Sequence, residues 1–262
     1  MRRVQWPLTP SPPPEPVTRC DFLRSLRGPA ERYDPGMRSG ALLVGFWVCA
    51  AVHLALVAAQ AAPFDTLTKA MLMPLLAAWA AASGGSRGLV AALLFSWGGD
   101  VCLNIDGLFI PGMALFAAAH VCYLSCFARR GALRRLPPAI PAGYGLAWLA
   151  AIVVLWPGLG DLRAPVAAYS LLLVSTAVIA WGVNRRAGAG ALLFLLSDSL
   201  IGVSLAGLPL LPLHDVVVMA TYLAAQYLLA SGLMSTPEHP GAARPLPTRA
   251  EDRGPEPADT RD

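Results

Sequence analysis

The sequence predicts an all-α membrane protein, a polytopic bundle of eight transmembrane helices. Of the 262 residues, 56% are apolar and only 14% are charged, whereas soluble domains carry about 25% charged residues. The charges also gather at the ends of the chain, because residues 1–38 and 235–262 together hold 21 of the 36. Gly, Pro and Arg divide the stretch between them into runs of about 20 apolar residues, the length that crosses a bilayer.

The chain divides into three parts. Residues 39–234 form the predicted membrane domain, and residues 1–38 and 235–262 are polar tails with 8 and 6 prolines that we expect to be disordered. No apolar segment precedes residue 39, so we expect no cleavable signal peptide there. Eight spans are predicted, at about residues 40–60, 67–83, 87–104, 108–127, 138–157, 164–182, 187–206 and 213–233.

Lys and Arg predict which helix ends face the cytoplasm. Eighteen of the 20 basic residues lie in tails or loops on one side of the predicted bundle, and only Lys69 and Arg163 lie on the other. The positive-inside rule therefore places both termini in the cytoplasm. In the absence of a lipidation or retention motif, we expect the endoplasmic reticulum. The basic residues lack interleaved aromatic residues, so nucleic acid is not an expected partner.

Two acidic residues, Asp100 and Asp198, lie inside predicted spans. An acid at mid-membrane costs several kcal/mol unless it is paired or faces water, so such residues are candidates for function. Asp100 lies 13 residues after Arg87, and Asp198 lies 12 residues after Arg186. Both carboxyl groups therefore lie about 18–20 Å along helices that start on the same side. We expect them to meet at one depth in the bundle.

The surroundings of the two aspartates are similar. Asp100 is followed 23 residues later by Tyr123, and Asp198 is followed 24 residues later by Tyr222. Spans 3–4 thus resemble spans 7–8, and the even offset of four spans suggests two parallel four-helix repeats. The polar residues that accompany the aspartates in the spans are Lys69, Asn104, His120, Tyr123, Tyr169, Tyr222 and Gln226. Interhelical hydrogen bonding is the alternative role for these side chains, and for Lys69 it is snorkelling to the interface.

Two buried carboxyl groups are suited to acid catalysis. Burial disfavours the charged form of each group, and a nearby carboxylate disfavours a second charge. A proton donor beside an anion suits a transition state that resembles an oxocarbenium ion, as in glycoside hydrolysis. Lys69, if close, would hold one aspartate ionised. Motifs for a serine hydrolase, a zinc protease or a P-loop are absent from the sequence, and the core histidines lie in separate spans.

Taken in order along residues 40–233, the polar motifs resemble those of the YhhN family of membrane proteins, the lysoplasmalogenases or alkenyl ether hydrolases. The stretch from Thr68 to Leu76 is similar to the family's Lys-containing entry to the second span, although Ala70 stands where the family commonly has Pro. The other matching positions are Gly99-Asp100; Phe116, His120, Tyr123 and Phe127; Tyr169; Gly190, Leu192, Leu193, Phe194, Ser197 and Asp198; and Tyr222, Gln226 and Leu228.

The resemblance implies hydrolysis of the vinyl ether bond of lysoplasmalogens. The products would be a fatty aldehyde and glycerophosphocholine or glycerophosphoethanolamine, with Asp100 and Asp198 as the catalytic pair and no metal or organic cofactor. The candidates for binding substrate or orienting water are Lys69, Asn104, His120, Tyr123, Tyr169, Tyr222 and Gln226. The sequence leaves open which aspartate is the acid and which headgroup is preferred.

Two other functions remain open from the residues alone. Mid-span acids and parallel repeats also suit a proton-coupled transporter. A noncatalytic protein that binds lysolipid in the bilayer is the third interpretation. A homodimer is left open too, because small residues such as Gly40, Gly202 and Ala206 serve helix contacts between copies and within one copy equally well.

Overall fold

The computed structural model describes residues 35–238, and all regular structure in this range is helical. This confirms the predicted all-α class. The predicted disordered tails lie outside the described residues, except at their inner ends. There, residues 35–38 of the predicted first tail form the start of a helix, because proline is tolerated in the first turn. The helices are α2 (Pro35–Ala58), α3 (Phe64–Ala82), α4 (Arg87–Leu103), α5 (Phe109–Arg129), η2 (Ala132–Arg135), α6 (Ala139–Leu155), η3 (Gly160–Leu162), α7 (Arg163–Ala180), α8 (Arg185–Leu205) and α9 (His214–Met234).

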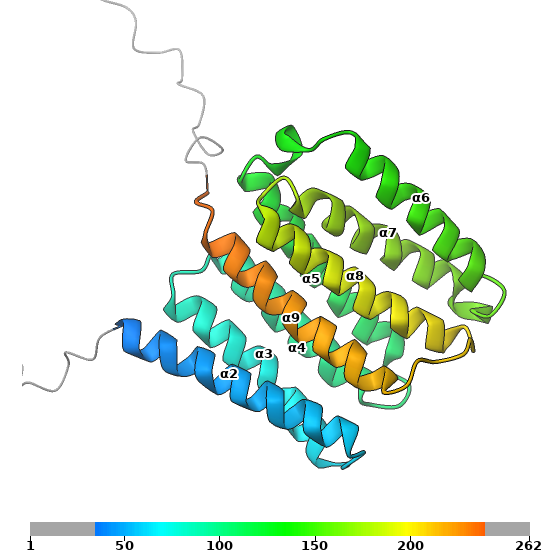
Figure 1. Cartoon of the computed structure of the whole chain (residues 1–262), viewed down its shortest axis with the longest axis horizontal. Helices are drawn as coiled ribbons and strands as arrows, with labels where there is room; N and C mark the ends of the chain where they lie inside the picture. Colours follow the sequence, from blue (N-terminus) through cyan, green and yellow to red (C-terminus); the bar gives the residue numbers. More distant parts are fainter. Residues whose placement is uncertain (1–34, 239–262) are drawn as a thin grey trace, which may run out of the picture.

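The long helices run side by side, and successive helices point in opposite directions (Figure 1). α4 packs along α5, α8 packs along α9, and these two pairs make the centre of the bundle together with α3 and α7. α2 lies at one edge and α6 at the other. α6 packs on α7 and buries little more than Leu155. The core therefore lies among α3, α4, α5, α7, α8 and α9, around side chains such as Leu76, Phe127 and Phe194.

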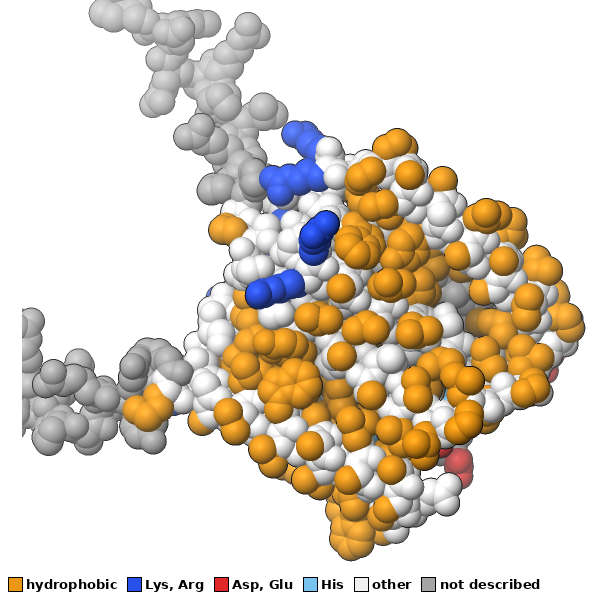
Figure 2. Space-filling view, viewed as in Figure 1, with side chains coloured by type: hydrophobic (Ala, Val, Ile, Leu, Met, Phe, Trp, Pro, Cys, Tyr) orange, Lys and Arg blue, Asp and Glu red, His pale blue; other side chains and the backbone are white. Residues whose placement is uncertain are grey.

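The surface suits a lipid environment. Apolar side chains cover most of the face in Figure 2, and basic side chains gather at one end of the helices. Five helical stretches in the described range are long and apolar enough to cross a bilayer. They are Met37–Ala58, Phe109–Arg129, Gly160–Ala180, Arg185–Leu205 and His214–Met234. α4 and α6 have 17 residues each, and α6 is strongly apolar. Helix length and composition thus identify a membrane protein with at least these five candidate spans.

Polar caps fix the start of the two helices that carry the aspartates. The Ser86 side chain accepts a hydrogen bond from the backbone N–H of Leu89 (3.4 Å) at the start of α4. Asn184 accepts one from the N–H of Ala187 (2.8 Å) at the start of α8. Ser and Asn are preferred at this position because their side chains satisfy an N–H that the helix leaves unpaired. Asn184 also donates to the carbonyl of Gly232 (2.7 Å), which ties the start of α8 to the end of α9.

The small residues considered for dimer contacts differ in how closely they pack against other parts of the same chain. A Cβ on Gly202 would meet the side chain of Leu155 at 3.2 Å, and Gly158 lies directly against the backbone of Ala206. These positions therefore allow close packing within one copy. Gly40 has no atom within 4 Å of its missing Cβ among the described residues. The homodimer stays a prediction.

Candidate active site

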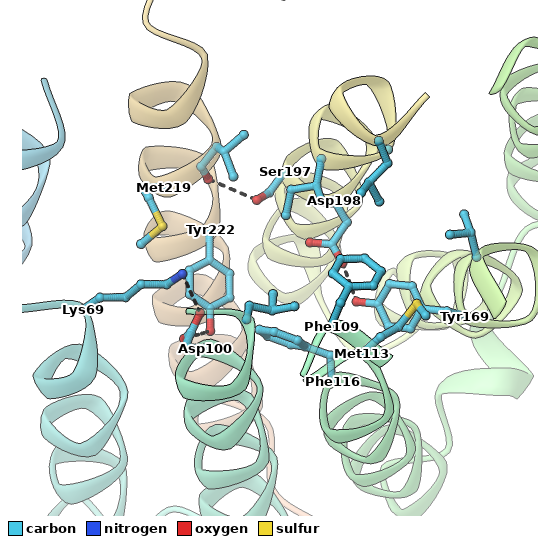
Figure 3. A pocket seen from close by; sticks show the side chains of 16 residues that line it. Lys69, Asp100, Phe109, Met113, Phe116, Tyr169, Ser197, Asp198, Met219 and Tyr222 are labelled. Carbon is cyan, nitrogen blue, oxygen red and sulfur yellow. Dashed lines mark hydrogen bonds and ion pairs between the residues drawn. The ribbon is translucent and has the colours of Figure 1, made fainter. Parts of the chain in front are cut away.

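Both aspartates line one cavity in the centre of the bundle. This central cavity has a volume of about 110 Å³ and lies among α3, α4, α5, α7, α8 and α9 (Figure 3). The two carboxyl groups therefore face the same space, as their equal depth in the sequence predicted. Its lining residues are Lys69, Asp100, Leu103, Phe109, Met113, Phe116, Val166, Tyr169, Ser197, Asp198, Ile201, Gly202, Leu205, Val218, Met219 and Tyr222.

Asp100 on α4 has a buried carboxyl group with polar partners from two other helices. Its residue surface is 4% exposed. The Tyr222 hydroxyl on α9 donates a hydrogen bond to Oδ2 (2.7 Å), and the Lys69 ammonium on α3 lies 3.9 Å from Oδ1. Lys69 also donates to Oδ1 of Asn104 (3.3 Å), one turn beyond the aspartate. Figure 3 shows Lys69 reaching across to this carboxyl group. Lys69 is therefore close to one of the two aspartates, which is the condition under which we expected it to act on a carboxyl group.

Asp198 on α8 has a different environment. The Tyr169 hydroxyl on α7 donates a short hydrogen bond to Oδ2, and Nε2 of His120 lies 3.5 Å from the same hydroxyl. In the part of the chain that the structure describes, no Lys or Arg lies within ion-pair distance of Asp198. One carboxyl group thus has a cationic partner, whereas the other has only neutral donors. This asymmetry distinguishes two residues that the sequence could not tell apart.

Three of the predicted binding residues lie behind the central cavity and do not line it. His120, Tyr123 and Gln226 are fully buried. The Tyr123 hydroxyl donates to Oε1 of Gln226 (2.6 Å), and the His120 ring packs edge-on against Phe194 with centroids 4.7 Å apart. They form a buried layer that supports the cavity wall. Buried polar groups are normally hydrogen-bonded. This requirement accounts for the hydrogen bond from Tyr123 on α5 to Gln226 on α9, and no contact with a ligand is needed to explain it.

The apolar wall of the cavity comes from α5, through Phe109, Met113 and Phe116 (Figure 3). Gly99, next to Asp100, makes this wall possible. A Cβ at Gly99 would lie 2.5 Å from the ring of Phe116, so only glycine lets the ring pack against α4. Sequence reasoning did not single out Phe109 or Met113, because an apolar residue in an apolar run carries no signal of its own.

Two further cavities adjoin the central one. The outer cavity, of about 460 Å³, shares Lys69, Val218 and Met219 with it and also contains Asn104. The side groove, of about 160 Å³, shares Val166, Tyr169, Asp198 and Gly202 with it. The rest of the groove is mainly apolar, lined by residues of α6, α7 and α8 such as Ala147, Trp148, Ile152, Leu173 and Leu195.

The three compartments together form a path of changing polarity. It leads from the polar outer cavity, past the two aspartates, to the apolar side groove. Such a path can bind a molecule with a polar head, a reactive centre and a hydrocarbon tail. Within residues 35–238, no group of three or more His, Cys, Asp or Glu side chains is arranged to hold a metal ion.

Comparisons with known proteins identify the family of the chain and several of its relatives. The model of the YhhN family matches residues 64–233. The chain is 38% identical over 165 residues to lysoplasmalogenase TMEM86B of Sus scrofa, covering 60% of this chain and 68% of that protein. It is 35% identical over 166 residues to lysoplasmalogenase TMEM86B of Homo sapiens, covering 59% and 67%. No solved structure matches the chain.

The similarity also extends to bacteria. The chain is 33% identical over 238 residues to a lysoplasmalogenase of Mycobacterium tuberculosis, covering 80% of this chain and 90% of that protein. These relatives confirm the predicted resemblance and the enzyme class that it implied. The matched region contains both aspartates and every residue that lines the central cavity. The chain therefore belongs to the YhhN family.

Proposed function

We propose that this protein hydrolyses the vinyl ether bond of lysoplasmalogens in a membrane. The products are a fatty aldehyde and glycerophosphocholine or glycerophosphoethanolamine. The observation that carries the proposal is the central cavity, where two carboxyl groups in unlike environments face one largely apolar space. The names of the relatives, all lysoplasmalogenases, support the same reaction.

We assign the proton donor to Asp198 and the anionic role to Asp100. A buried carboxylate without a cation is costly, and a proton removes that cost. Asp198 has this environment, since its partner is the neutral Tyr169 hydroxyl. Asp100 has the Lys69 ammonium 3.9 Å away, which favours a carboxylate there.

The reaction follows from these roles. Asp198 transfers its proton to the β-carbon of the vinyl ether, forming a C–H bond and an oxocarbenium ion. The Asp100 carboxylate stabilises this cation and orients a water molecule, which adds to the cationic carbon. The hemiacetal that results collapses to aldehyde and alcohol, and the proton released by water returns to Asp198. No redox step or second substrate besides water is needed.

The neighbouring compartments suit the two ends of such a substrate. The side groove begins at Asp198 and is mainly apolar, so it can hold the alkenyl chain beside the reacting bond. α6 closes one wall of this groove with few buried side chains, which leaves it accessible from the surrounding lipid. We assign a supporting role to three of the predicted binding residues, Tyr123, Gln226 and His120, because they are fully buried and do not line the central cavity.

We also propose that all eight long helices cross the membrane, with both termini in the cytoplasm. α4 and α6 are about 26 Å long at 1.5 Å per residue, close to the thickness of a thin bilayer. They run alongside the five longer candidate spans (Figure 1). The endoplasmic reticulum and the two parallel repeats stay predictions.

Aldehyde release from 1-alkenyl lysophospholipid by the purified protein tests the function. We expect activity in the wild type and a loss of about 10²–10⁴-fold in kcat for Asp198→Asn, which cannot supply the proton. Asp100→Asn, which removes the anion, is expected to lose a similar factor. Asp106→Asn is the matched control, because Asp106 lies in the exposed loop between α4 and α5 and does not line the cavity.

The outcomes separate this proposal from the alternatives. Full activity in both cavity variants, each properly folded, would end the two-aspartate mechanism. A folded wild type that binds lysolipid and releases no aldehyde would indicate a binding protein. Proton-dependent flux of lysolipid across vesicles, again without aldehyde, would indicate a transporter.

A further inference from the structure

The outer cavity has features of a site for a charged headgroup. It opens at the end of the bundle where α2, α3, α4 and α9 meet, and it is joined to the central cavity at Lys69. The carboxyl groups of Asp65 and Asp215 and the His53 ring line it. We infer that this cavity binds the phosphoethanolamine headgroup of the substrate and selects it over phosphocholine. The inference rests on the proposed function and deepens it.

His53 supplies an unsatisfied hydrogen-bonding atom in this cavity. The residue is 1% exposed, and its Nδ1 lies 2.9 Å from Oγ1 of Thr68. The Thr68 hydroxyl donates to the backbone carbonyl of Asp65 (2.9 Å), so it accepts from His53. In the neutral ring Nδ1 therefore carries the proton and Nε2 presents a lone pair. Among the described residues, Nε2 has no hydrogen-bond partner, whereas buried polar atoms in proteins normally have one.

The charges in the outer cavity match a zwitterion. Lys69 lies on the side toward the central cavity and is the cation available to a phosphate group there. Asp65 and Asp215 supply two carboxylates in the same cavity. In a lysophospholipid the phosphate lies between the glycerol and the amine, so a phosphate at Lys69 leaves the amine within the outer cavity. The order of charges along the cavity thus follows the order of charges along the headgroup.

The lining residues favour a primary ammonium over a quaternary one. A primary ammonium donates three hydrogen bonds, which the two carboxylates and Nε2 of His53 can accept. A trimethylammonium group donates none and is usually recognised by the faces of aromatic rings. Among the described residues that line the outer cavity, none is Phe, Tyr or Trp. Choline therefore lacks the contacts that it needs here.

The test compares three substrates in the full-length enzyme. They are 1-alkenyl lysophosphoethanolamine, 1-alkenyl lysophosphocholine and 1-alkenylglycerol, which has no headgroup. We expect the wild type to show a kcat/KM about five- to tenfold higher for the ethanolamine lipid than for the choline lipid. The double variant Asp65→Asn/Asp215→Asn is expected to raise KM for the ethanolamine lipid by that factor, with kcat unchanged. Asp161→Asn, an exposed aspartate outside this cavity, is the matched control.

Hydrolysis of 1-alkenylglycerol separates the headgroup site from the chemistry. Unchanged turnover of this substrate by the double variant supports the inference, whereas an equal loss on all three substrates would overturn it. An unchanged KM for the ethanolamine lipid, or an equal rise in KM for both phospholipids, would also overturn it.

Calorimetry with glycerophosphoethanolamine and glycerophosphocholine tests the same site without turnover. Tighter binding of the former to the wild type, lost in the double variant, is the expected result. Equal binding of both would contradict the inference even if the protein released no aldehyde.

Discussion

Tyr222 and Tyr123 both donate hydrogen bonds in the core of the bundle, but only Tyr222 faces the central cavity. Removing the Tyr222 hydroxyl takes away the 2.7 Å hydrogen bond that orients Asp100. We expect Tyr222→Phe to lower kcat by about 10–100-fold with little change in stability. Aldehyde release at saturating substrate, measured beside thermal unfolding in detergent, tests this.

Tyr123→Phe is the matched comparison, because it removes the same atom one layer away. It leaves Oε1 of Gln226 buried without its donor. The expected result is a loss of about 1–3 kcal/mol in stability with kcat close to that of the wild type. If Tyr123→Phe instead reduced kcat as much as Tyr222→Phe at full stability, the assignment of Tyr123 to a supporting layer would be wrong.

The site residues that the sequence revealed are those whose presence in an apolar run is costly. Asp100, Asp198 and Lys69 stood out for this reason, and the structure brings them to one cavity. Their different environments could not be predicted, because they depend on which helix Lys69 faces. His53 was noted only as one of several core histidines, although it lines the outer cavity. Arg130 was interpreted as a loop charge, yet it is 4% exposed and donates to the Cys126 carbonyl (2.9 Å).

Gly99 is one of the glycines at which α4 and α5 approach each other closely, and it is the one that lies against Phe116 in the cavity wall. A methyl group at Gly99 would lie 2.5 Å from the Phe116 ring, whereas one at the preceding Gly98 would lie 3.2 Å from the flexible end of Leu115. We expect Gly99→Ala to displace Phe116 and lower kcat/KM by about tenfold or more, with a loss of about 1–3 kcal/mol in stability. Kinetics of aldehyde release and thermal unfolding measure both effects.

Gly98→Ala is the control for this substitution. Both changes replace glycine by alanine within α4, so both gain about 1 kcal/mol of helix propensity. The control variant is therefore expected to be as active and at least as stable as the wild type. Equal losses in the two variants would point to a general effect on α4 and would refute a specific role for the Gly99–Phe116 contact.

Helix boundaries could be predicted closely, because Gly, Pro and Arg interrupt the apolar runs. The predicted spans agree with the helices to within three residues at every end except the start of α2. There the helix begins at Pro35, five residues early, since proline is well tolerated in the first turn. Helix boundaries do not test the predicted internal repeat, and the hydrogen bonds of the two aspartates do not follow it. Asp100 is paired with Tyr222, but Asp198 is paired with Tyr169 and not with Tyr123, the residue that symmetry would select.

At the scale of the whole molecule, charge distinguishes the two ends of the bundle. The starts of α4 and α8 and the end of α5 carry Arg87, Arg185 and Arg129, and Figure 2 shows basic side chains gathered at one end. Asp65 and Asp215 begin α3 and α9 at the opposite end. This asymmetry of charge could be predicted from the sequence, because the order of the helices and the charges of the loops can both be read from it. The positions of the three cavities could not be predicted from the sequence, because they depend on how the helices pack.

The proposed orientation places the basic end in the cytoplasm, and labelling of single introduced cysteines tests it. Arg134→Cys lies in the exposed η2 segment at the basic end, and Asp106→Cys lies in the exposed loop between α4 and α5 at the other end. In sealed microsomes, whose outer surface is the cytoplasmic face of the endoplasmic reticulum, a membrane-impermeant maleimide is expected to label Arg134→Cys only. Asp106→Cys is expected to react only after permeabilisation, and the unsubstituted chain gives the background from the native cysteines. The reverse pattern would invert the topology and turn the outer cavity toward the cytoplasm, where the headgroup would then have to enter.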